Sequence, residues 1–275
     1  MEVMLGSYAV DIATGFGPRI TGLRHHQGTP LFASLPPELG LEHDDGFYRF
    51  HGGHRLWAAP EIAPVTYAPD DHECVVTSEG DSVLISAPPD RPGLVKEIEV
   101  TAEGDELVVE HRLSAASGSS RAVAPWAITQ VPLGGMAILS LAGTSTAPLP
   151  DRQIVLWPYT DLDDHRIRLQ GGAVVVAAEA ASELKIGTGP TAGRIGYLRE
   201  GWLFVKTLEG AGGGEVPDFG AVHQVYVGDD FCELENMGGI ETVSTEATAR
   251  LIERWRALQC SDLESAIRHV TDLPS

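Results

Sequence analysis

Cysteine, basic residues and long apolar runs are scarce in this chain, and each scarcity excludes a kind of protein. Among 275 residues there are three cysteines, Cys74, Cys232 and Cys260, with no CxxC spacing, which disfavours a disulfide framework and a cysteine zinc site. Basic residues number 19 against 39 acidic ones, so the formal net charge is −20. Because nucleic acid and anionic membranes repel a polyanion, neither is an expected partner. Ala173–Ala178 is among the longest apolar runs, so no segment approaches the length of a membrane span.

Signals for export and for several known chemistries are also missing. The opening residues carry Glu2 where a secretory leader would carry Lys or Arg, so the sequence predicts a cytoplasmic protein. There is no GxSxG nucleophile motif and no Gly-rich loop of the Walker or dinucleotide-binding type. We therefore expect no cofactor, and a homodimer stays open as the assembly.

Turn-forming residues and an alternation of period two are abundant. The 31 glycines and 18 prolines argue against a helical bundle and for many short elements. Leu94–Val100 and Leu107–Leu113 alternate apolar and polar side chains on either side of a turn, which predicts a hairpin. Further strands are predicted at Tyr8–Ile12, Cys74–Thr77, Val83–Ser86, Ala137–Leu141, Val174–Ala177, Trp202–Thr207, Val222–Val227 and Phe231–Glu235.

One helix is predicted, at the C-terminus. Ser261 and Glu264 have the spacing of a capping box. Apolar side chains then recur at i, i+4 and i+7, at Leu263, Ile267 and Val270.

The preceding stretch Leu251–Leu258 fits a helix and a strand equally well. No linker divides the chain, since the loop Gly210–Gly214 is too short for one and lies between two strand patterns. We therefore expect a single all-β domain over residues 1–275, made of two large packed sheets with a short C-terminal helix.

The densest polar and aromatic segment is His51–Trp57, HGGHRLW. Its glycines let the backbone approach a ligand closely, Arg55 offers a rigid fork of donors, and Trp57 offers a flat apolar face that can stack on a sugar ring. A Gly-rich turn with a core tryptophan and a surface arginine is the structural alternative.

The same segment also offers metal ligands, His51 and His54, with Glu61 as a third. The i, i+3 spacing of the two histidines suits ligation on a helix, and the two glycines between them oppose a helix. We therefore expect no metal.

Acidic residues inside an apolar strand pattern mark a second segment, Phe231–Asn236. On a strand, Glu233 and Glu235 point to the same face, which is costly unless that face is solvated or used for chemistry. A plain solvent-facing strand is the alternative. Two loops carry comparable polar groups and could equally be ordinary turns: Val216–Gly220 with Asp218 and the nearby His223, and Trp157–Arg166 with Tyr159.

The order of these segments carries a resemblance. The chain opens on Gly15–Ile20 and closes on Phe231–Glu235, with Gly53–Trp57, Pro125–Gln130 and Val216–Gly220 between them. In this order they resemble the galactose mutarotase-like (aldose 1-epimerase) superfamily, and the three middle segments resemble a separate branch of it. The likeness runs from about Tyr8 to about Leu258. It implies a β-supersandwich of the galactose mutarotase type, whose concave face holds a sugar.

The resemblance also implies roles for individual residues. Glu235 matches the carboxylate base of the family, with Glu233 as the alternative if the alignment shifts by two. Arg55 matches the arginine near the sugar hydroxyls and Asp218 the sugar-binding aspartate. Trp57, Trp126 and Tyr159 are expected to contact substrate.

One position departs from the family. Where active mutarotases carry Asn-His, with histidine as the acid, this chain has Gln130, which can donate a hydrogen bond but cannot release a proton at useful cost. The acid would then be His54 or His223.

Three functions follow as alternatives. The first is a sugar isomerase of the mutarotase type, with Glu235 as base and His54 as acid. The second is a carbohydrate-binding protein without turnover, which the missing histidine favours. The third is a lyase, cyclase or epimerase on a polyhydroxylated or glycosylated metabolite, because one fold hosts several chemistries.

Overall fold

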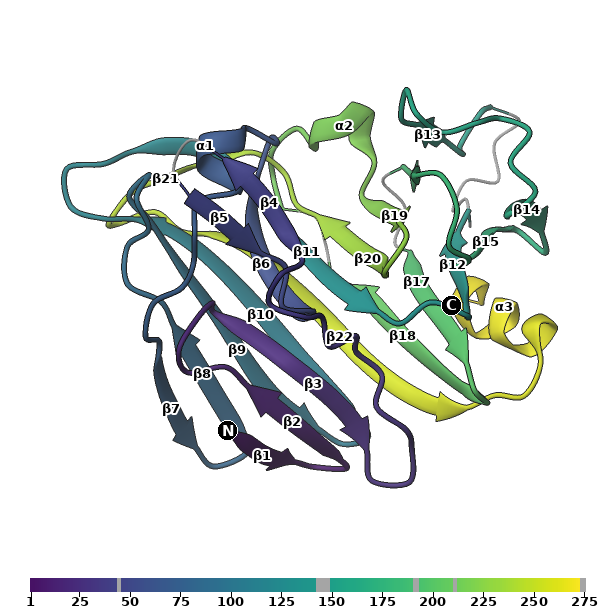
Figure 1. The fold of residues 1–275 in the computed structure, drawn as a ribbon, viewed down its shortest axis with the longest axis horizontal. Coiled ribbons are helices and arrows are strands. Elements are labelled where there is room, and N and C mark those ends of the chain that lie inside the picture. The colour runs from purple at the N-terminus through teal and green to yellow at the C-terminus, as the bar shows by residue number, and fades with distance from the viewer. Residues whose placement is uncertain (44–45, 142–148, 190–192, 210–211, 273–275) are drawn as a thin grey trace.

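A computed structural model describes residues 1–43, 46–141, 149–189, 193–209 and 212–272 (Figure 1). Within them the chain forms two large antiparallel sheets, a two-stranded hairpin and three helices. None of the helices in this part of the chain is long and apolar enough to cross a membrane.

The first sheet has its ends formed by the N-terminal strand and by a short strand from the middle of the chain. Its order is β1 (Glu2–Leu5), β2 (Tyr8–Ile12), β3 (Arg19–His25), β6 (Gly53–Ala59), β11 (Arg121–Val131), β20 (Cys232–Met237), β19 (His223–Val227), β16 (Leu184–Thr188) and β13 (Ile154–Leu156), with β21 (Glu241–Val243) paired to β11. Its central strands therefore come from four distant parts of the sequence.

The second sheet has a similar size. Its order is β14 (Ile167–Gln170), β15 (Ala173–Ala177), β12 (Met136–Ser140), β17 (Arg194–Arg199), β18 (Trp202–Leu208), β22 (Ala249–Gln259), β10 (Glu106–Ala115), β9 (Leu94–Glu103), β8 (Ser82–Ser86) and β7 (Val75–Glu79). The predicted hairpin is confirmed as β9–β10, and every other predicted strand is present with its ends moved by at most two residues.

The main core lies between the two sheets, which face one another (Figure 1). Alternation decides which side chains enter it: in β10, Leu107, Val109, His111 and Leu113 are all fully buried. Leu56 of β6 and Leu234 of β20 enter the same core from the first sheet. Because one face of β6 and of β20 is used up in this way, their odd-numbered side chains, Arg55 and Glu233 among them, lie on the outer face.

The C-terminal helix α3 (Leu263–Thr271) packs on the outer face of the second sheet, against β12 and β17. Ile267 and Val270 bury its apolar side, as the spacing predicted. The predicted capping box is wrong by one residue, because Asp262 is the N-cap and accepts a hydrogen bond from the backbone N–H of Ser265 at 2.8 Å.

The ambiguous stretch before that helix is a strand. β22 pairs with β10 and β18 over its length, and every second side chain, including Leu251 and Trp255, is buried. An apolar residue at every second position satisfies a central strand, and the helical spacing in the sequence is coincidental.

The outer face of the first sheet is partly covered near β6. The hairpin of β4 (Gly40–His43) and β5 (Gly46–Arg49) and the short helix α1 (Ala63–Thr66) bring Tyr48 and Tyr67 against Trp57, with ring centroids 5.4 and 5.1 Å away. α2 (Pro217–Gly220) lies before β19. These additions leave a recess over the central strands.

Candidate functional site

A cleft of about 410 Å³ opens on the outer face of the first sheet, over β6, β11, β20, β19 and β16. Strand pairing sets two rows of outward side chains next to one another: Arg55, Ile128, Glu235 and Gln224 in one, and Gln130, Glu233, Tyr226 and Lys185 in the other. The cleft thus brings two carboxylates and two cations, from the three strands β6, β20 and β16, onto one surface.

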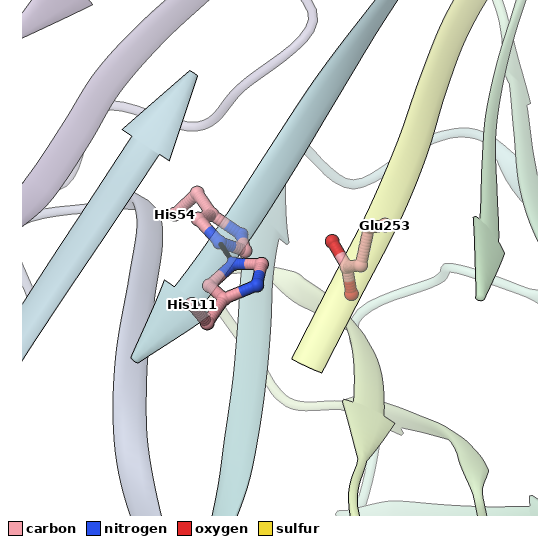
Figure 2. Close-up of side chains that lie close together, drawn as sticks. All are labelled: His54, His111 and Glu253. Carbon is pink, nitrogen blue, oxygen red and sulfur yellow. Dashed lines mark hydrogen bonds between the residues drawn. The ribbon is translucent and has the colours of Figure 1, made fainter. Parts of the chain in front are cut away.

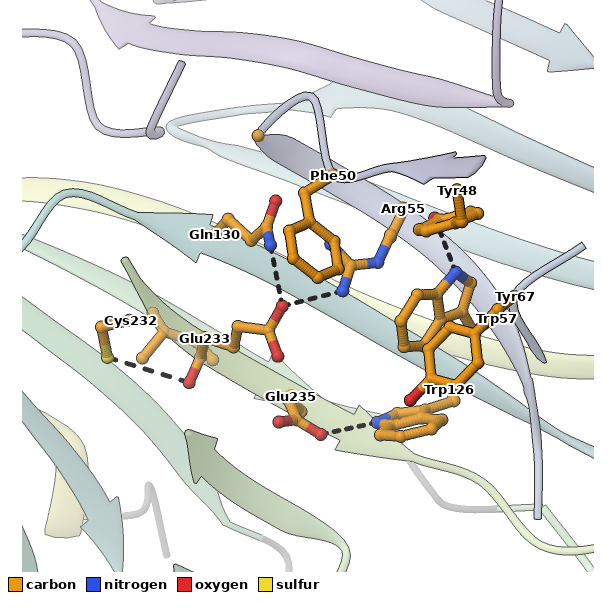
Figure 3. Close-up of polar contacts among 12 residues, drawn as sticks. Tyr48, Phe50, Arg55, Trp57, Tyr67, Trp126, Gln130, Cys232, Glu233 and Glu235 are labelled. Atoms are coloured by element: carbon orange, nitrogen blue, oxygen red, sulfur yellow. Dashed lines mark hydrogen bonds and ion pairs between the residues drawn. The ribbon is translucent and has the colours of Figure 1, made fainter. Parts of the chain in front are cut away.

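The first charged pair joins Arg55 and Glu233. Arg55 Nη2 donates to Glu233 Oε1 at 2.8 Å, and Gln130 Nε2 donates to the same oxygen at 2.9 Å (Figure 3). Arg55 is 2% exposed and its guanidinium lies 4.1 Å from the centre of the Trp57 ring. Charge-assisted hydrogen bonding therefore holds one oxygen of the Glu233 carboxylate, and a cation–π contact with Trp57 covers one face of the Arg55 guanidinium. The position of Glu233 in its strand predicts that it holds Arg55 or another cation by a charge-assisted pair, and the contact with Arg55 is such a pair.

The second charged pair joins Lys185 and Glu235. Lys185 Nζ donates to Glu235 Oε2 at 2.9 Å, and Trp126 Nε1 donates to the same oxygen at 2.8 Å. The ammonium lies between two indole rings, 4.7 Å from that of Trp126 and 4.8 Å from that of Trp157. Burial raises the pKa of Glu235, and the Lys185 and Trp126 donors partly oppose that shift.

Several buried polar atoms on this face have no hydrogen-bond partner among the described residues. They are Arg55 Nε and Nη1, Gln130 Oε1, Gln224 Oε1 and Glu235 Oε1. Unpaired buried polar groups are rare in folded proteins, because each costs about 1–3 kcal/mol. Their gathering at one place is typical of a binding site in which a ligand supplies the missing hydrogen bonds.

Aromatic rings form the walls of the cleft. Trp57 and Trp126 lie edge to face with centroids 5.4 Å apart, and Trp57 Nε1 donates to Tyr48 Oη at 2.8 Å (Figure 3). Tyr159 and Tyr226 also line the cleft. Trp57, Trp126 and Tyr159, which are expected to contact substrate, all line the cleft, and Trp57 is 6% exposed and also belongs to a small core cluster.

His54 does not reach the cleft. It alternates with Arg55 along β6 and points into the core between the sheets, where it is fully buried and contacts His111 (Figure 2). The Trp255 ring packs edge to face against it. His223 is likewise buried, and its Nδ1 is 2.6 Å from Asn236 Oδ1 on the core side of β20. Neither histidine can reach a ligand in the cleft, so the expectation that one of them is the acid does not fit this geometry.

The depth of the two glutamates also differs from the expectation. Because Asn236–Gly239 follows Glu235 directly and is expected to open a loop, the sequence predicts that Glu235 lies nearer to an approaching ligand and that Glu233 lies deeper. In the structure Glu233 lines the cleft and is 8% exposed, whereas Glu235 is fully buried behind the Trp126 and Lys185 side chains. The backbone after β20 is held by hydrogen bonds, because the Gly238 N–H donates to the Pro125 carbonyl in β11 and the Ile240 N–H donates to the Glu215 carbonyl before β19.

Asp218 lies outside the lining of the cleft. It is part of α2, where its φ of 55° is in the left-handed region, and its carboxylate accepts a hydrogen bond from Gln224 Nε2 at 3.2 Å. The Gln224 side chain belongs to the outward row of β19, on the face where the cleft opens. Among the described residues, Asp218 is therefore linked to that face by its hydrogen bond with Gln224.

The proposed metal ligands are separated. His54 lies in the core, Glu61 at the rim of the cleft beside Tyr67, and His51 beside Asp71, with 3.4 Å between His51 Nε2 and Asp71 Oδ1. Two other groupings of ligand type exist in the described part of the chain: His54 with His111 and Glu253, and His51 with Asp70 and Asp71.

Sequence reasoning missed Lys185, the second cation of the site. A usable signal was present, since Lys185 is a charge in the middle of a strand that is otherwise apolar and fully buried, the same signal that drew attention to the glutamates. Tyr67 and Tyr226 were also missed, and no pattern in their segments distinguishes them from core aromatics.

No protein-family model and no curated protein sequence matches the chain. Solved structures share its fold. A galactose mutarotase-like protein from Lactobacillus casei matches with a TM-score of 0.59 and 10% identity, over 94% of this chain and 99% of that one. A galactose mutarotase related enzyme from Lactobacillus acidophilus matches with a TM-score of 0.54 and 8% identity, over 95% and 98%. For an aldose epimerase homologue from C. elegans the values are 0.51 and 10%, over 95% and 99%.

The chain therefore has the galactose mutarotase-like fold, as the order of its motifs predicted. At these identities the likeness shows the fold alone. What the site does has to be argued from its own residues.

Proposed function

We propose that the cleft binds a small carbohydrate and interconverts its anomers by acid–base catalysis, without a cofactor. The observation that carries the proposal is the presence of two carboxylate–cation pairs, Arg55–Glu233 and Lys185–Glu235, side by side between tryptophan rings. A sugar ring has apolar C–H faces and hydroxyl edges, so it matches aromatic walls and charged hydrogen-bonding groups together.

Anomer exchange needs a base at the anomeric hydroxyl and an acid at the ring oxygen. Glu233 is the base in this proposal, because it is the glutamate that lines the cleft. It takes the proton of the anomeric hydroxyl while the bond from the anomeric carbon to the ring oxygen breaks. Lys185, which also lines the cleft, gives a proton to the ring oxygen, and the open-chain aldehyde forms.

Rotation about the bond between the first two carbons then presents the other face of the aldehyde. The hydroxyl that ring opening released attacks that face of the aldehyde. Its proton returns to Lys185, and Glu233 returns its proton to the new anomeric oxygen. Protons and electrons balance without any other reagent. Arg55 and Gln130 orient Glu233, and Glu235 holds the Lys185 ammonium in place.

A carbohydrate-binding protein without turnover is the second candidate. It is favoured by the engagement of both carboxylates in ion pairs and by the lack of a histidine in the described lining of the cleft. The two candidates share their ligand class and differ in catalysis.

NMR anomer exchange across a panel of free aldoses separates them. Exchange that is accelerated by the wild type and lost in Glu233→Gln supports the isomerase. Saturable binding without accelerated exchange would replace it with the binding protein. If no sugar of the panel binds and none exchanges its anomers faster, both candidates are wrong.

A further inference from the structure

The cleft has a strong excess of negative charge at its mouth. Its described lining holds five carboxylates, Glu61, Glu183, Asp229, Asp230 and Glu233, against two cations, Arg55 and Lys185. The first four carboxylates are exposed at the rim, and none of them forms an ion pair with a described residue.

The two cations are already neutralised inside the site. Arg55 is bound to Glu233 and covered by the Trp57 ring, and Lys185 is bound to Glu235. An anionic ligand group would therefore meet no free positive charge to offset the rim. Sites that recognise phosphate or carboxylate groups present unpaired arginine or lysine forks, and the described lining offers none.

Hydrogen-bond donors for uncharged oxygen atoms are nevertheless present. Arg55 lines the cleft and is 2% exposed. Its Nε and Nη1 have no hydrogen-bond partner among the described residues. Because its charge is balanced by Glu233, these N–H groups suit the lone pairs of a hydroxyl or ring oxygen.

The rim carboxylates are oriented by tyrosines. The Tyr226 hydroxyl donates to Glu183 Oε1 at 2.7 Å, and the Tyr67 hydroxyl donates to Glu61 Oε1. Burial raises the pKa of both phenols, so they remain donors at neutral pH. Aromatic faces beside fixed carboxylates are the surroundings in which an ammonium group is stabilised.

We propose that the cleft selects its carbohydrate by charge: it takes uncharged sugars and amino sugars, and it excludes sugar phosphates and uronic acids. This inference rests on the proposed function, since it names the substrate class of the same cleft. The rim carboxylates Glu61, Glu183, Asp229 and Asp230 determine this selection.

The test measures binding by tryptophan fluorescence, because Trp57 and Trp126 line the cleft. The probes are matched sets with gluco, galacto and manno rings, each as the neutral hexose, the 2-amino sugar and the 6-phosphate. We expect the 6-phosphate to bind at least about tenfold more weakly than the neutral hexose of the same ring, and the amino sugar at least as tightly as that hexose.

Changing the salt concentration and removing the rim charges distinguish selection by charge from selection by shape. Between about 0.01 M and about 1 M salt the screening length falls from about 30 Å to about 3 Å, so the difference between amino sugar and phosphate should shrink. The triple variant Glu183→Gln, Asp229→Asn, Asp230→Asn should shrink it at low salt as well. Glu79→Gln, an exposed acid of β7 in the other sheet, is the control and should leave it unchanged.

The outcomes separate this inference from the proposed function. A sugar phosphate that binds as tightly as its neutral hexose overturns charge selection and leaves the sugar site standing. Charge-selective binding without anomer exchange supports the selection and overturns the isomerase. No binding by any probe overturns both.

Discussion

His54 and His111 face one another across the core, with 2.7 Å between their Nε2 atoms. His111 Nδ1 lies 3.0 Å from the carbonyl oxygen of Leu251, which can only accept, so Nδ1 carries the proton and Nε2 of a neutral His111 is an acceptor. His54 therefore donates from Nε2, and its Nδ1 accepts from the Thr129 hydroxyl at 2.8 Å. Two neutral imidazoles satisfy every contact.

The same arrangement continues to a buried ion pair. Lys206 Nζ donates to Thr129 Oγ1 at 3.0 Å and lies 3.1 Å from Glu253 Oε1, and all of these side chains are fully buried. Trp255 Nε1 donates to Glu253 Oε2 at 2.6 Å. This network joins the two sheets beneath the cleft and has no open position for another proton.

We expect the protein to lose stability as the pH falls below about 6.5. Burial lowers the pKa of His54 and of His111, so the unfolded chain binds protons near pH ~6.5 that the native state does not. The stability that these groups contribute is complete above that pH. Below it, the free energy of unfolding should fall by up to about 1.4 kcal/mol per pH unit for each histidine.

Urea unfolding between pH 5 and pH 8 measures this slope, and NMR titration assigns it. The imidazole signals of His54 and His111 should not titrate in this range. Titration of His54 or His111 near pH ~6.5 in the folded protein would contradict the neutral pair.

We also expect no functional metal. In the cluster of His54, His111 and Glu253 the Nε2 atoms are engaged with each other, and the Lys206 ammonium beside Glu253 opposes a second cation. Elemental analysis of protein purified without added metal tests this. A stoichiometric transition metal, with anomer exchange lost on chelation, would overturn it.

Trp57→Ala should weaken sugar binding by about 1–3 kcal/mol, because the ligand loses an apolar wall of the cleft. Titration calorimetry with the best-binding sugar measures the change. Thermal denaturation has to be followed in parallel, since Trp57 also packs against Tyr48 and Trp126. Trp202→Phe, outside the cleft, is the control, and an affinity of Trp57→Ala equal to that of wild type would mean that Trp57 only packs the core.

Glu233→Gln should lower the rate of anomer exchange by about 10²–10⁴, the usual effect of losing a general base. Glu235→Gln should be less harmful to the chemical step, because Glu235 acts on the ligand through Lys185. Turnover and affinity of both variants decide the order. Loss of turnover in Glu235→Gln alone would restore the order expected from the sequence, with Glu235 as the base.

Lys185→Arg should keep ligand affinity within about tenfold and lose most turnover, since guanidinium keeps the charge but does not release a proton at neutral pH. Lys185→Met should also destabilise the protein, because removing one partner of a buried pair leaves the other unpaired at a cost of about 3–5 kcal/mol. Lys96→Met, which breaks a buried pair with Asp90 in the other sheet, is the control for that loss. Full exchange activity in Lys185→Arg would remove Lys185 as the acid.

Particular segments explain why the fold was predictable. Alternation in Leu107–Leu113 is strict because one face of β10 packs entirely in the core, and such strands can be recognised locally. The stretch Leu251–Leu258 was ambiguous because its apolar spacing fits two periods, and only its pairing partners on both sides decide for a strand. The Ser261 cap failed because Asp262 offers a competing side-chain acceptor one position later.

The candidate site was predictable only in part. Glu233, Arg55 and Trp57 stood out because they break an apolar pattern or sit beside glycines. Lys185 is distant from them in the sequence and reaches Glu235 only because β16 and β20 both pair with β19. Such a neighbour depends on the order of strands in the sheet, which no local pattern contains.

The sequence by itself determined where ten of the strands and the C-terminal helix lie, and which side chains of one strand share a face, because side chains alternate along an extended backbone. It could not determine which of the two faces meets the second sheet. The tertiary structure decided that: it turned His54 into the core with His111 and left Arg55 in the cleft. It also decided that Glu235 is buried more deeply than Glu233. The depth of each carboxylate depends on the side chains that distant strands place over it, and Trp126 and Lys185 cover Glu235.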